Sequence, residues 1–262
     1  MFSGIVQELG RVRANAGGRL SVRAAGVVSE ARTGDSVAVS GCCLTVVQLD
    51  PDGFVADVVP ETARRTTIGA LSPGDPVNLE ASMRLSDVVG GHLVTGHVDE
   101  VGDVQSVDDD ANARRVTIAA PEKLLWLVAE RGSIAVDGIS LTVTGVSAEA
   151  FSVSLIPHTI EITTAGSWTV GSRVNLEADV IARYVHRSLL GAGVTLVARE
   201  TVSEARRHVP VSAGLAEIRA AGRLGEQRSS VHCGFVRWLA PARRRVSSAG
   251  RRHNRTTASR EA

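Results

Sequence analysis

The sequence predicts an all-β protein built from two similar small barrels, at roughly residues 1–95 and 96–185. Three observations predict this class: a long pattern is written twice, each copy consists of short strands punctuated by Gly and Pro, and helical patterns are sparse. The 262 residues suffice for two modest domains. Closing each sheet into a barrel would hide edges that a small unit otherwise leaves unpaired.

The internal repeat is extensive. Residues 38–81 align with residues 135–178 without a gap, and about 18 of roughly 45 positions are identical, far more than unrelated segments share. The string VNLEA recurs whole, at 77–81 and 174–178. After a small change of offset, residues 3–10 match residues 95–102. A period of about a hundred residues indicates a duplicated domain, because solenoid repeats span about 20–50.

Each copy contains strand and turn signals in the same order. Residues 36–50 alternate around β-branched residues, PDG at 51–53 predicts a turn, and a strand resumes at 54–59. In the second copy the strand pattern covers 132–147, followed by a polar break at Glu149 and a strand at 151–157. The SPGD string at 72–75 predicts a tight turn before the VNLEA strand.

Two helices are expected. Residues 122–129 follow Pro121 and predict a short helix on the second barrel, since proline is well tolerated at a first helical position. Residues 179–190 begin with Asp179 as an N-cap, and apolar residues recur there every fourth position. This apolar stripe must be buried, and a sister subunit is a reasonable partner.

Composition limits the classes of function. Apolar residues make up 44% of the chain and aromatics 3%, so Val, Leu, Ile and Ala must fill the cores. The net charge of +1 argues against an obligate partner such as duplex nucleic acid. Only Lys123 of the 29 basic residues is a lysine, so Arg-rich patches are discounted as a general bias of the chain.

Cysteine usage and the N-terminus predict a reducing, cytoplasmic location. The chain has three cysteines, of which Cys42 and Cys43 are adjacent and point to opposite faces of a strand, so no disulfide framework is expected. The sequence MFSGIVQELG has no secretory leader pattern. No window reaches the roughly 18–20 apolar residues of a membrane span, so no membrane partner is expected.

Positions kept in both copies indicate shared structure. Gly41 and Gly138 predict a bulge or a close backbone approach. The pairs Thr45/Thr142 and Thr62/Thr159 fit either ordinary strand threonines or one polar pocket per barrel. Both interpretations stay open from the residues alone.

Positions that differ between the copies indicate chemistry gained by one half. Cys43 in the first copy aligns with Ser140 in the second, and each shares a strand face with a threonine. A free cysteine also fits the role of a small buried apolar residue. His97 replaces Ile5 and fits either a structural role or proton transfer near neutral pH. Asp179 fits either a helix cap or a site carboxylate.

Common catalytic and cofactor motifs are missing from the sequence. His92 and His97 lack the HExxH spacing and have no third ligand nearby, so no metal site is expected. There is no GxGxxG, GxxxxGK[ST] or GxSxG string, which weakens dinucleotide, NTPase and serine-hydrolase functions.

The strings MFSGIV, SGCCLTV, NLEASMRLSDVVGGHLVTGHVD, VDGISLTV, LIPHT and VNLEADVIARYV resemble the riboflavin synthase alpha-subunit family, over about residues 1–190. The resemblance implies two six-stranded Greek-key barrels, a trimerisation helix at 179–190, and a homotrimer with active sites between one N-terminal barrel and a neighbour's C-terminal barrel. It also implies association with lumazine synthase.

The implied reaction converts two molecules of 6,7-dimethyl-8-ribityllumazine into riboflavin and 5-amino-6-(D-ribitylamino)uracil. One substrate molecule gives a four-carbon unit to the other, without a metal or organic cofactor. Two related pockets with unlike catalytic groups would suit a substrate that is used in two roles.

The resemblance also implies the site residues. It assigns the N-barrel pocket, with Phe2 supporting, to Gly4, Ile5, Val6, Ser36, Cys43, Leu44, Thr45 and Thr62. It assigns the C-barrel pocket to Gly96, His97, Val98, Arg131, Ser140, Leu141, Thr142, Leu155, Ile156, Pro157, His158, Thr159 and Ile160. The expected catalytic set is His97, Ser140, Thr142, Asp179 and Cys43. The family usually has lysine where this chain has Arg131, which keeps the charge but changes the geometry.

Two alternatives compete with the enzyme: a lumazine- or flavin-binding protein of the optical-antenna type, and a ligand-free scaffold. The full polar set in both halves favours catalysis over either. The resemblance stops near Gly191, and the Arg-rich segment 191–262 predicts a disordered extension, with a misread coding end, RNA binding or membrane binding as the alternatives.

Overall fold

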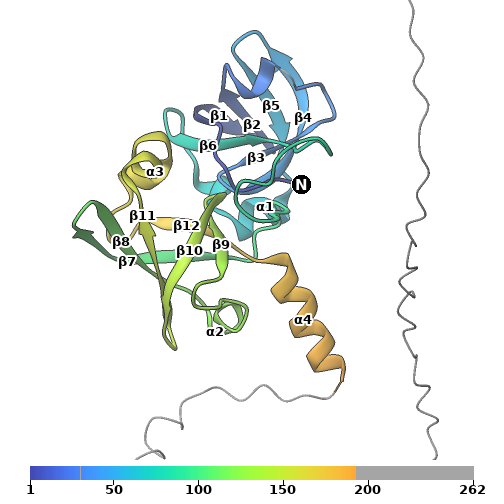
Figure 1. The fold of residues 1–262 in the computed structure, drawn as a ribbon. Helices are drawn as coiled ribbons and strands as arrows, with labels where there is room; N and C mark the ends of the chain where they lie inside the picture. Colours follow the sequence, from blue (N-terminus) through green and yellow to red (C-terminus); the bar gives the residue numbers. More distant parts are fainter. Residues whose placement is uncertain (30, 193–262) are drawn as a thin grey trace, which may run out of the picture. The chain divides into compact units, whose positions relative to one another are not determined.

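The computed structural model describes residues 1–29 and 31–192, which form two six-stranded antiparallel barrels followed by a helix (Figure 1). The two-barrel prediction is therefore confirmed. The expected Arg-rich extension lies, from residue 193 onward, outside the described residues.

The two barrels have the same topology. The first closes in the order β1-β2-β5-β4-β3-β6, and the second closes with the equivalent strands in the same order. The N-terminal barrel consists of β1 (Glu8–Ala16), β2 (Arg19–Arg23), β3 (Ser36–Val39), β4 (Cys42–Asp50), β5 (Gly53–Asp57) and β6 (Pro76–Ala81). The C-terminal barrel consists of β7 (Glu100–Asp110), β8 (Ala113–Ala119), β9 (Ser133–Val136), β10 (Ile139–Val146), β11 (Ala150–Leu155) and β12 (Arg173–Ala178).

Each barrel has its own hydrophobic core. Phe54 and Leu79 are fully buried in the first, and their repeat equivalents Phe151 and Leu176 are buried in the second. Inward residues alternate with outward ones along the strands, as the side-chain period of two requires. The two clusters are separate, so the duplication has produced two cores rather than one enlarged core.

The predicted strands 36–50 and 132–147 are each broken into a hairpin, which corrects the sequence-based expectation. Ser40 and Gly41 have φ values of 42° and 78°, and Asp137 and Gly138 have 47° and 76°. Two central residues with positive φ are the mark of a type I′ turn, whose twist matches that of the flanking strands. The Ser-Gly and Asp-Gly dipeptides are the sequence signal for this turn.

The two turns meet at the junction between the barrels. A Cβ atom on Gly41 would lie 2.5 Å from the backbone nitrogen of Gly138, and one on Gly138 would lie 2.7 Å from that of Gly41. These glycines therefore mark a close backbone approach, one of the two expected alternatives.

Two asparagines of the repeated VNLEA strings join the barrels. The Asn78 amide donates to the carbonyl of Asp137 at 2.9 Å and to Thr164 Oγ1 at 2.8 Å. In the reverse direction the Asn175 amide donates to the carbonyl of Ser40 at 2.8 Å. The junction is thus held by reciprocal bonds from the same position in each copy.

The helices differ in part from the expectation. The short helices α1 (Pro60–Arg65) and α3 (Pro157–Ile162) were not predicted; each begins at a proline, which suits a first helical turn. Helix α2 (Glu122–Leu125) ends four residues earlier than expected, because the chain turns before β9. Helix α4 (Val180–Gly191) is confirmed, with the Asp179 side chain accepting from the Ile181 N–H at 2.9 Å.

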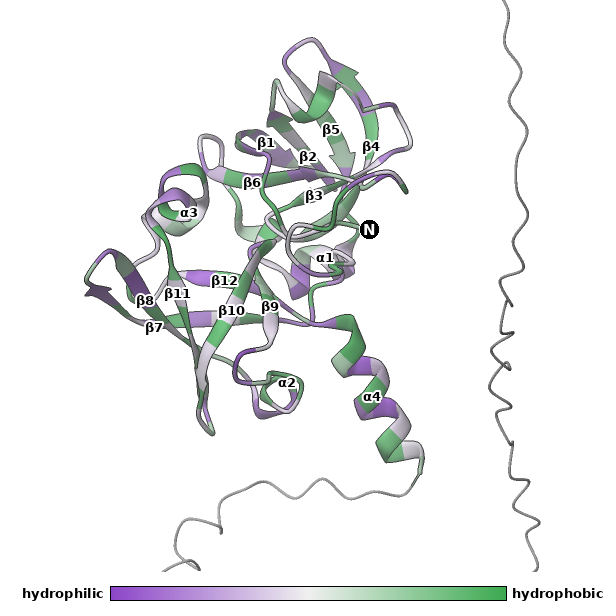
Figure 2. Ribbon diagram, in the orientation of Figure 1, coloured by the Kyte–Doolittle hydropathy of each residue, from purple (hydrophilic) through white to green (hydrophobic). Residues whose placement is uncertain are grey.

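Helix α4 leaves the second barrel with no buried residue of its own. Ile181, Tyr184 and Val185 are 61%, 72% and 51% exposed, and apolar and polar residues both line the helix (Figure 2). Among residues 1–29 and 31–192, every helix is too short or too polar to span a bilayer.

Candidate functional site

Two short segments cross from one barrel to the other. The segment before β1 reaches the second barrel, where the N–H of Ser140 donates to the carbonyl of Gly4 at 2.7 Å. The segment before β7 reaches the first barrel, where the N–H of Cys43 donates to the carbonyl of Gly96 at 2.9 Å. The side chain of Val6 accordingly belongs to the core of the second barrel, and Val98 packs against that of the first.

This exchange corrects the expected grouping of residues. The family resemblance predicts residues 4–6 in the pocket with Cys43, and residues 96–98 in the pocket with Ser140. The structure places each segment with the opposite barrel. Sequence comparison within the chain could not reveal this, because two aligned copies show which residues correspond but not which barrel each one contacts.

The crossing segments lie at free strand edges. Strand β4 pairs with β5 only from Val46 onward, and β10 pairs with β11 only from Val143 onward. The preceding residues pair with β3 and β9 on one side, and their other edge is left for the incoming glycine carbonyl. Each strand thus presents a predicted site residue, Cys43 or Ser140, where two segments from different barrels meet.

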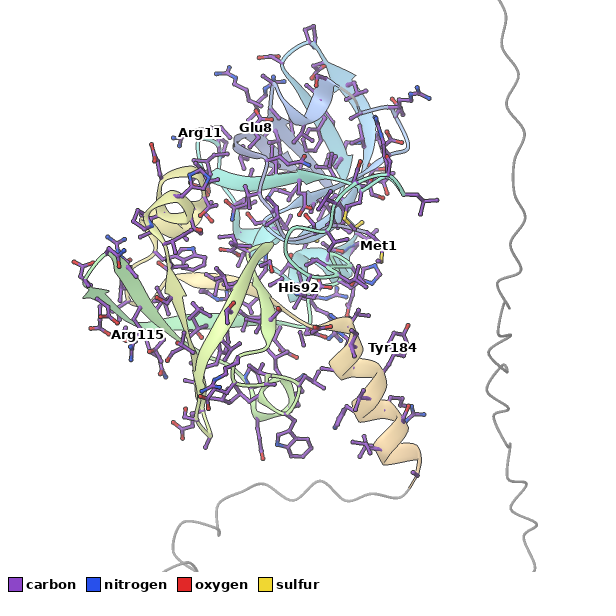
Figure 3. All side chains as sticks on the ribbon, viewed as in Figure 1. Met1, Glu8, Arg11, His92, Arg115 and Tyr184 are labelled. Atoms are coloured by element: carbon purple, nitrogen blue, oxygen red, sulfur yellow. The ribbon has the colours of Figure 1, made fainter. Side chains whose placement is uncertain are left out.

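The cluster on the second barrel contains Ser140 and an unexpected histidine. The Nδ1 atom of His92 lies 2.7 Å from Ser140 Oγ. His92 comes from the link between the two copies and lies where the barrels approach each other (Figure 3). It was not among the predicted site residues, because that link has no counterpart in the repeat. The nearby Gly91 allows the approach, since a Cβ there would lie 2.7 Å from Ser140 Oγ.

The protonation of His92 is shaped by burial. Loss of solvent lowers the pKa of His92, and the carboxylates of Asp179 and Glu177 act in the opposite direction without cancelling the effect. The imidazole is therefore neutral near pH 7 and can accept a proton. The Nε2 atom is buried and has no hydrogen-bond partner among the described residues.

The other residues expected near Ser140 fall into two groups: some have exposed side chains and others have side chains that point into the barrel core. Thr142 is exposed on the same face as Ser140, and His158 and Thr159 lie in the first turn of α3. Leu141 and Leu155 point into the core, so only their backbone atoms can face a ligand. Arg131 is exposed before β9 with a φ of 66°. Other predicted positions of this group are Ile156, Pro157 and Ile160, at the start of α3.

The cluster on the first barrel contains different groups. Cys43 is partly exposed beside Phe2, and Thr45 shares its face. His97 is exposed on the segment that contacts Cys43, so within one chain it lies with Cys43 rather than with Ser140. Thr62 lies in α1, the counterpart of α3. Leu44, like Leu141, points into the core.

The two neighbouring thiols have different environments. Burial, with smaller contributions from the neighbouring Cys43 and Glu177, raises the pKa of Cys42 to about 12. Cys42 therefore stays protonated, whereas Cys43 faces the cluster. The predicted residue Ser36 lines a cavity of about 750 Å³ with residues from 26–37 and 81–87, and no other predicted site residue lines it.

The two clusters offer organic groups for proton transfer and hydrogen bonding. In the described ranges no group of three or more His, Cys, Asp or Glu side chains is arranged to hold a metal ion. One cluster pairs an imidazole with a hydroxyl, and the other has the Cys43 thiol with Thr45 on the same strand face and His97 next to Gly96 along the chain. Such a pair of related but unlike sites can bind one heterocycle twice and treat each copy differently.

Comparisons with known proteins match the duplicated barrel. The lumazine binding domain model matches twice, at residues 3–82 and 95–179. The chain is 49% identical over 201 residues to riboflavin synthase of Mycobacterium tuberculosis, covering 74% of this chain and all of that protein. It is 37% identical over 193 residues to riboflavin synthase of Bacillus subtilis, covering 72% and 90%.

A similar fold occurs in a solved structure. The crystal structure of LumP complexed with riboflavin superposes with a TM-score of 0.63 at 25% identity, covering 68% of this chain and 99% of that one. The doubled domain match and the identity to full-length relatives identify the chain as a member of the riboflavin synthase family.

Proposed function

We propose that the chain catalyses the riboflavin synthase reaction, the last step of riboflavin biosynthesis. Two molecules of 6,7-dimethyl-8-ribityllumazine give riboflavin and 5-amino-6-(D-ribitylamino)uracil by transfer of a four-carbon unit. Family membership supports this activity. The observation that carries it is the His92–Ser140 contact in one cluster, where the duplicate cluster has Cys43 instead.

The chemistry requires removal of a proton from the methyl group at C7 of lumazine, whose anion is delocalised into the ring. A neutral imidazole that contacts a hydroxyl suits this step, and burial keeps His92 neutral near pH 7. We assign proton removal to His92 and Ser140, whereas the expected proton-handling set is His97, Ser140, Thr142 and Asp179. Asp179 acts on this cluster by charge, since its carboxylate opposes the lowering of the His92 pKa, and Thr142 shares the strand face of Ser140.

The second substrate molecule binds at the cluster of Cys43, Thr45, Thr62 and His97. Its partly exposed thiol and hydroxyls bind the ring and favour addition of a nucleophile, either water or Cys43. Holding two reactants face to face contributes a large part of the acceleration, since orientation alone can supply roughly 7–11 kcal/mol at best.

A homotrimer would bring the two kinds of cluster together, one from each of two neighbouring subunits. The exposed apolar side chains of α4 support an association through this helix. Light scattering of the purified chain tests the trimer, and Val185→Glu should dissociate it. Association with lumazine synthase, which co-purification tests, and a cytoplasmic location, which cell fractionation tests, stay predictions.

Purified protein incubated with 6,7-dimethyl-8-ribityllumazine tests the activity. Riboflavin fluorescence should rise, with one riboflavin and one pyrimidinedione formed for every two lumazines consumed. The likeness to riboflavin-bound LumP favours, as the second candidate, a protein that binds lumazine and riboflavin without turnover. Tight binding without product would establish that candidate, and the absence of binding would exclude both.

A further inference from the structure

Two buried glutamates hold the crossing segments. Glu80 in β6 is 4% exposed and Glu177 in β12 is 2% exposed. The Glu80 carboxylate accepts hydrogen bonds from Ser3 N (2.6 Å), Ser3 Oγ (2.7 Å) and Gly4 N (3.0 Å). The Glu177 carboxylate accepts from Thr95 N (2.7 Å), Thr95 Oγ1 (2.6 Å) and Gly96 N (2.9 Å).

The held glycines transmit this placement to the other barrel. The Gly4 carbonyl accepts from the N–H of Ser140, and the Gly96 carbonyl accepts from the N–H of Cys43. Both contacts are tightly packed: a Cβ on Gly4 would lie 2.6 Å from Ser140 Cβ, and a Cβ on Gly96 would lie 2.6 Å from Cys43 Cβ. A shift of the segment must therefore move the backbone that carries the reactive side chain.

We propose that Glu80 and Glu177 are reciprocal positioning residues, each belonging to one barrel and setting the reactive residue of the other. Glu80 of the first barrel sets Ser140, and Glu177 of the second sets Cys43. This rests on the proposed function in treating Ser140 and Cys43 as reactive groups, and its structural part is tested without turnover.

The carboxylate is suited to this task because its two oxygens accept three or more hydrogen bonds and donate none. Glutamine has the same shape, but its NH₂ group replaces one of the accepting oxygens. The backbone N–H that this oxygen accepted from then faces another donor and loses its hydrogen bond. A displacement of about 1 Å at a reacting group can reduce catalysis by about 100-fold.

Substitutions in the full chain test the proposal. Glu80→Gln and Glu177→Gln weaken the two arrangements, and Ser3→Ala and Thr95→Ala remove one hydroxyl donor from each without changing charge. Ser3→Ala and Thr95→Ala are needed because the charge of Glu177 also shifts the pKa of His92 upward. Removing that charge therefore affects turnover in two ways. These milder variants also serve if a glutamine variant fails to fold.

Glu8→Gln is the matched control. Its carboxylate likewise accepts from three backbone N–H groups, those of Ala25, Gly26 and Val27, at 2.7, 2.9 and 2.9 Å. These bonds stay within the first barrel, and neither cluster depends on them. Glu8→Gln should lower Tm while leaving kcat and KM within about twofold of the parent, as expected for a purely structural carboxylate.

The direct readout is the alkylation rate of one thiol in each cluster, followed by mass spectrometry of the modified peptides. Cys43 reports on the first barrel, and the thiol introduced by Ser140→Cys reports on the second. Thr95→Ala should change the Cys43 rate at least about threefold and leave the other thiol unchanged. Glu177→Gln should change the Cys43 rate similarly, with a smaller effect on the other thiol because Glu177 also acts on the pKa of His92, which contacts position 140. Glu80→Gln and Ser3→Ala should do the reverse, and Glu8→Gln should affect neither.

Turnover of the variants without the added thiol completes the test, with kcat falling at least about tenfold in both glutamine variants. Equal changes at both thiols, or changes no larger than in Glu8→Gln, would overturn the proposal. Failure of the parent protein to convert lumazine would instead contradict the proposed function, while the thiol rates would still decide the structural part of the positioning proposal.

Discussion

The Nδ1 atom of His92 lies 2.7 Å from the Oγ atom of Ser140, although 48 residues separate them in the chain. His92 belongs to the link between the two copies, and Ser140 is the second residue of β10, the strand that carries the C-barrel cluster. We predict that His92→Gln and Ser140→Ala each lower kcat by about 10²–10⁴-fold, the range typical of a lost proton-transfer group.

Riboflavin affinity should change much less than kcat in both variants, because the ring contacts stay in place. Steady-state kinetics with a fluorescence titration measures both quantities. Asp109→Asn, at an exposed position near the end of β7, is a control that should retain full activity. An equal fall in binding and turnover would contradict the proton-transfer role.

The crossing glycines provide a second prediction. Gly96 has a φ of 76°, and a Cβ there would lie 2.6 Å from Cys43 Cβ; Gly17 has a φ of 61° with nothing within 4 Å. Gly17→Ala should cost roughly 1–2 kcal/mol for the left-handed backbone, and Gly96→Ala should cost more because its Cβ would also clash with Cys43. Only Gly96→Ala should also reduce kcat/KM, as enzyme assays and urea unfolding will measure. Equal activity in the two variants would show that the contact is not needed.

The buried carboxyl of Asp137 predicts a pH dependence of stability. Burial raises the pKa of Asp137 to about 7, with hydrogen bonds from Asn175 and Trp168 opposing the shift. A raised folded-state pKa means that the native protein binds more protons than the unfolded chain between about pH 4 and pH 7. The free energy of unfolding contributed by this group therefore falls as pH rises through that window.

Asp137→Ser, which copies the equivalent Ser40 of the first barrel, should remove this contribution. As pH rises from 4 to 8, Tm of the parent should fall relative to Tm of the variant. The difference between the two Tm values should be most unfavourable to the parent above pH 7. Parallel Tm profiles would contradict the assignment. Calorimetry at several pH values provides the measurement.

The adjacent thiols should differ in reactivity. With its pKa raised to about 12, Cys42 carries almost no thiolate at pH 8, whereas Cys43 is partly exposed in the candidate site. Iodoacetamide should modify Cys43 at least about tenfold faster than Cys42, and riboflavin should slow the reaction of Cys43. Tandem mass spectrometry of the shared peptide distinguishes the two positions; modification of Cys42 first would contradict the burial argument.

The reciprocal asparagines predict how strongly the barrels are joined. Asn78→Ala removes the bonds to Asp137 and Thr164 and leaves buried polar groups unpaired. We expect a loss of about 1–3 kcal/mol in the free energy of unfolding. Gln48→Ala, at an exposed position on β4, should change it by less than about 0.5 kcal/mol in the same urea titrations.

Much of the fold was accessible from sequence because the duplication lets each half be compared with the other. The VNLEA strings, the turn before them and the Asp179 cap all lie where local patterns place them. The hairpins at Ser40-Gly41 and Asp137-Gly138 were missed, since alternation of side chains continues across a two-residue turn. Helices α1 and α3 were missed because six residues are too few for a helical period to appear.

The site was predicted less completely for a physical reason. Residues such as Ser140 and Thr142 share a strand face, which sequence spacing indicates directly. The contact of His92 with Ser140 and the exchange of Gly4 and Gly96 are tertiary, and no local pattern encodes which barrel a connecting segment will reach. These are the contacts on which the proposed division of roles depends.

The crossing of the two segments also bears on what half of this chain can do. A chain ending near residue 90 would keep Cys43 but lose the Gly96 carbonyl, which accepts the hydrogen bond of the Cys43 N–H. The Gly4 carbonyl of that chain would likewise lose its donor, the N–H of Ser140. In a two-fold dimer of that half, the Gly4 carbonyl of each copy could accept the hydrogen bond of the Cys43 N–H of the other copy. Gene fusion makes such a pair permanent and frees its two pockets to diverge.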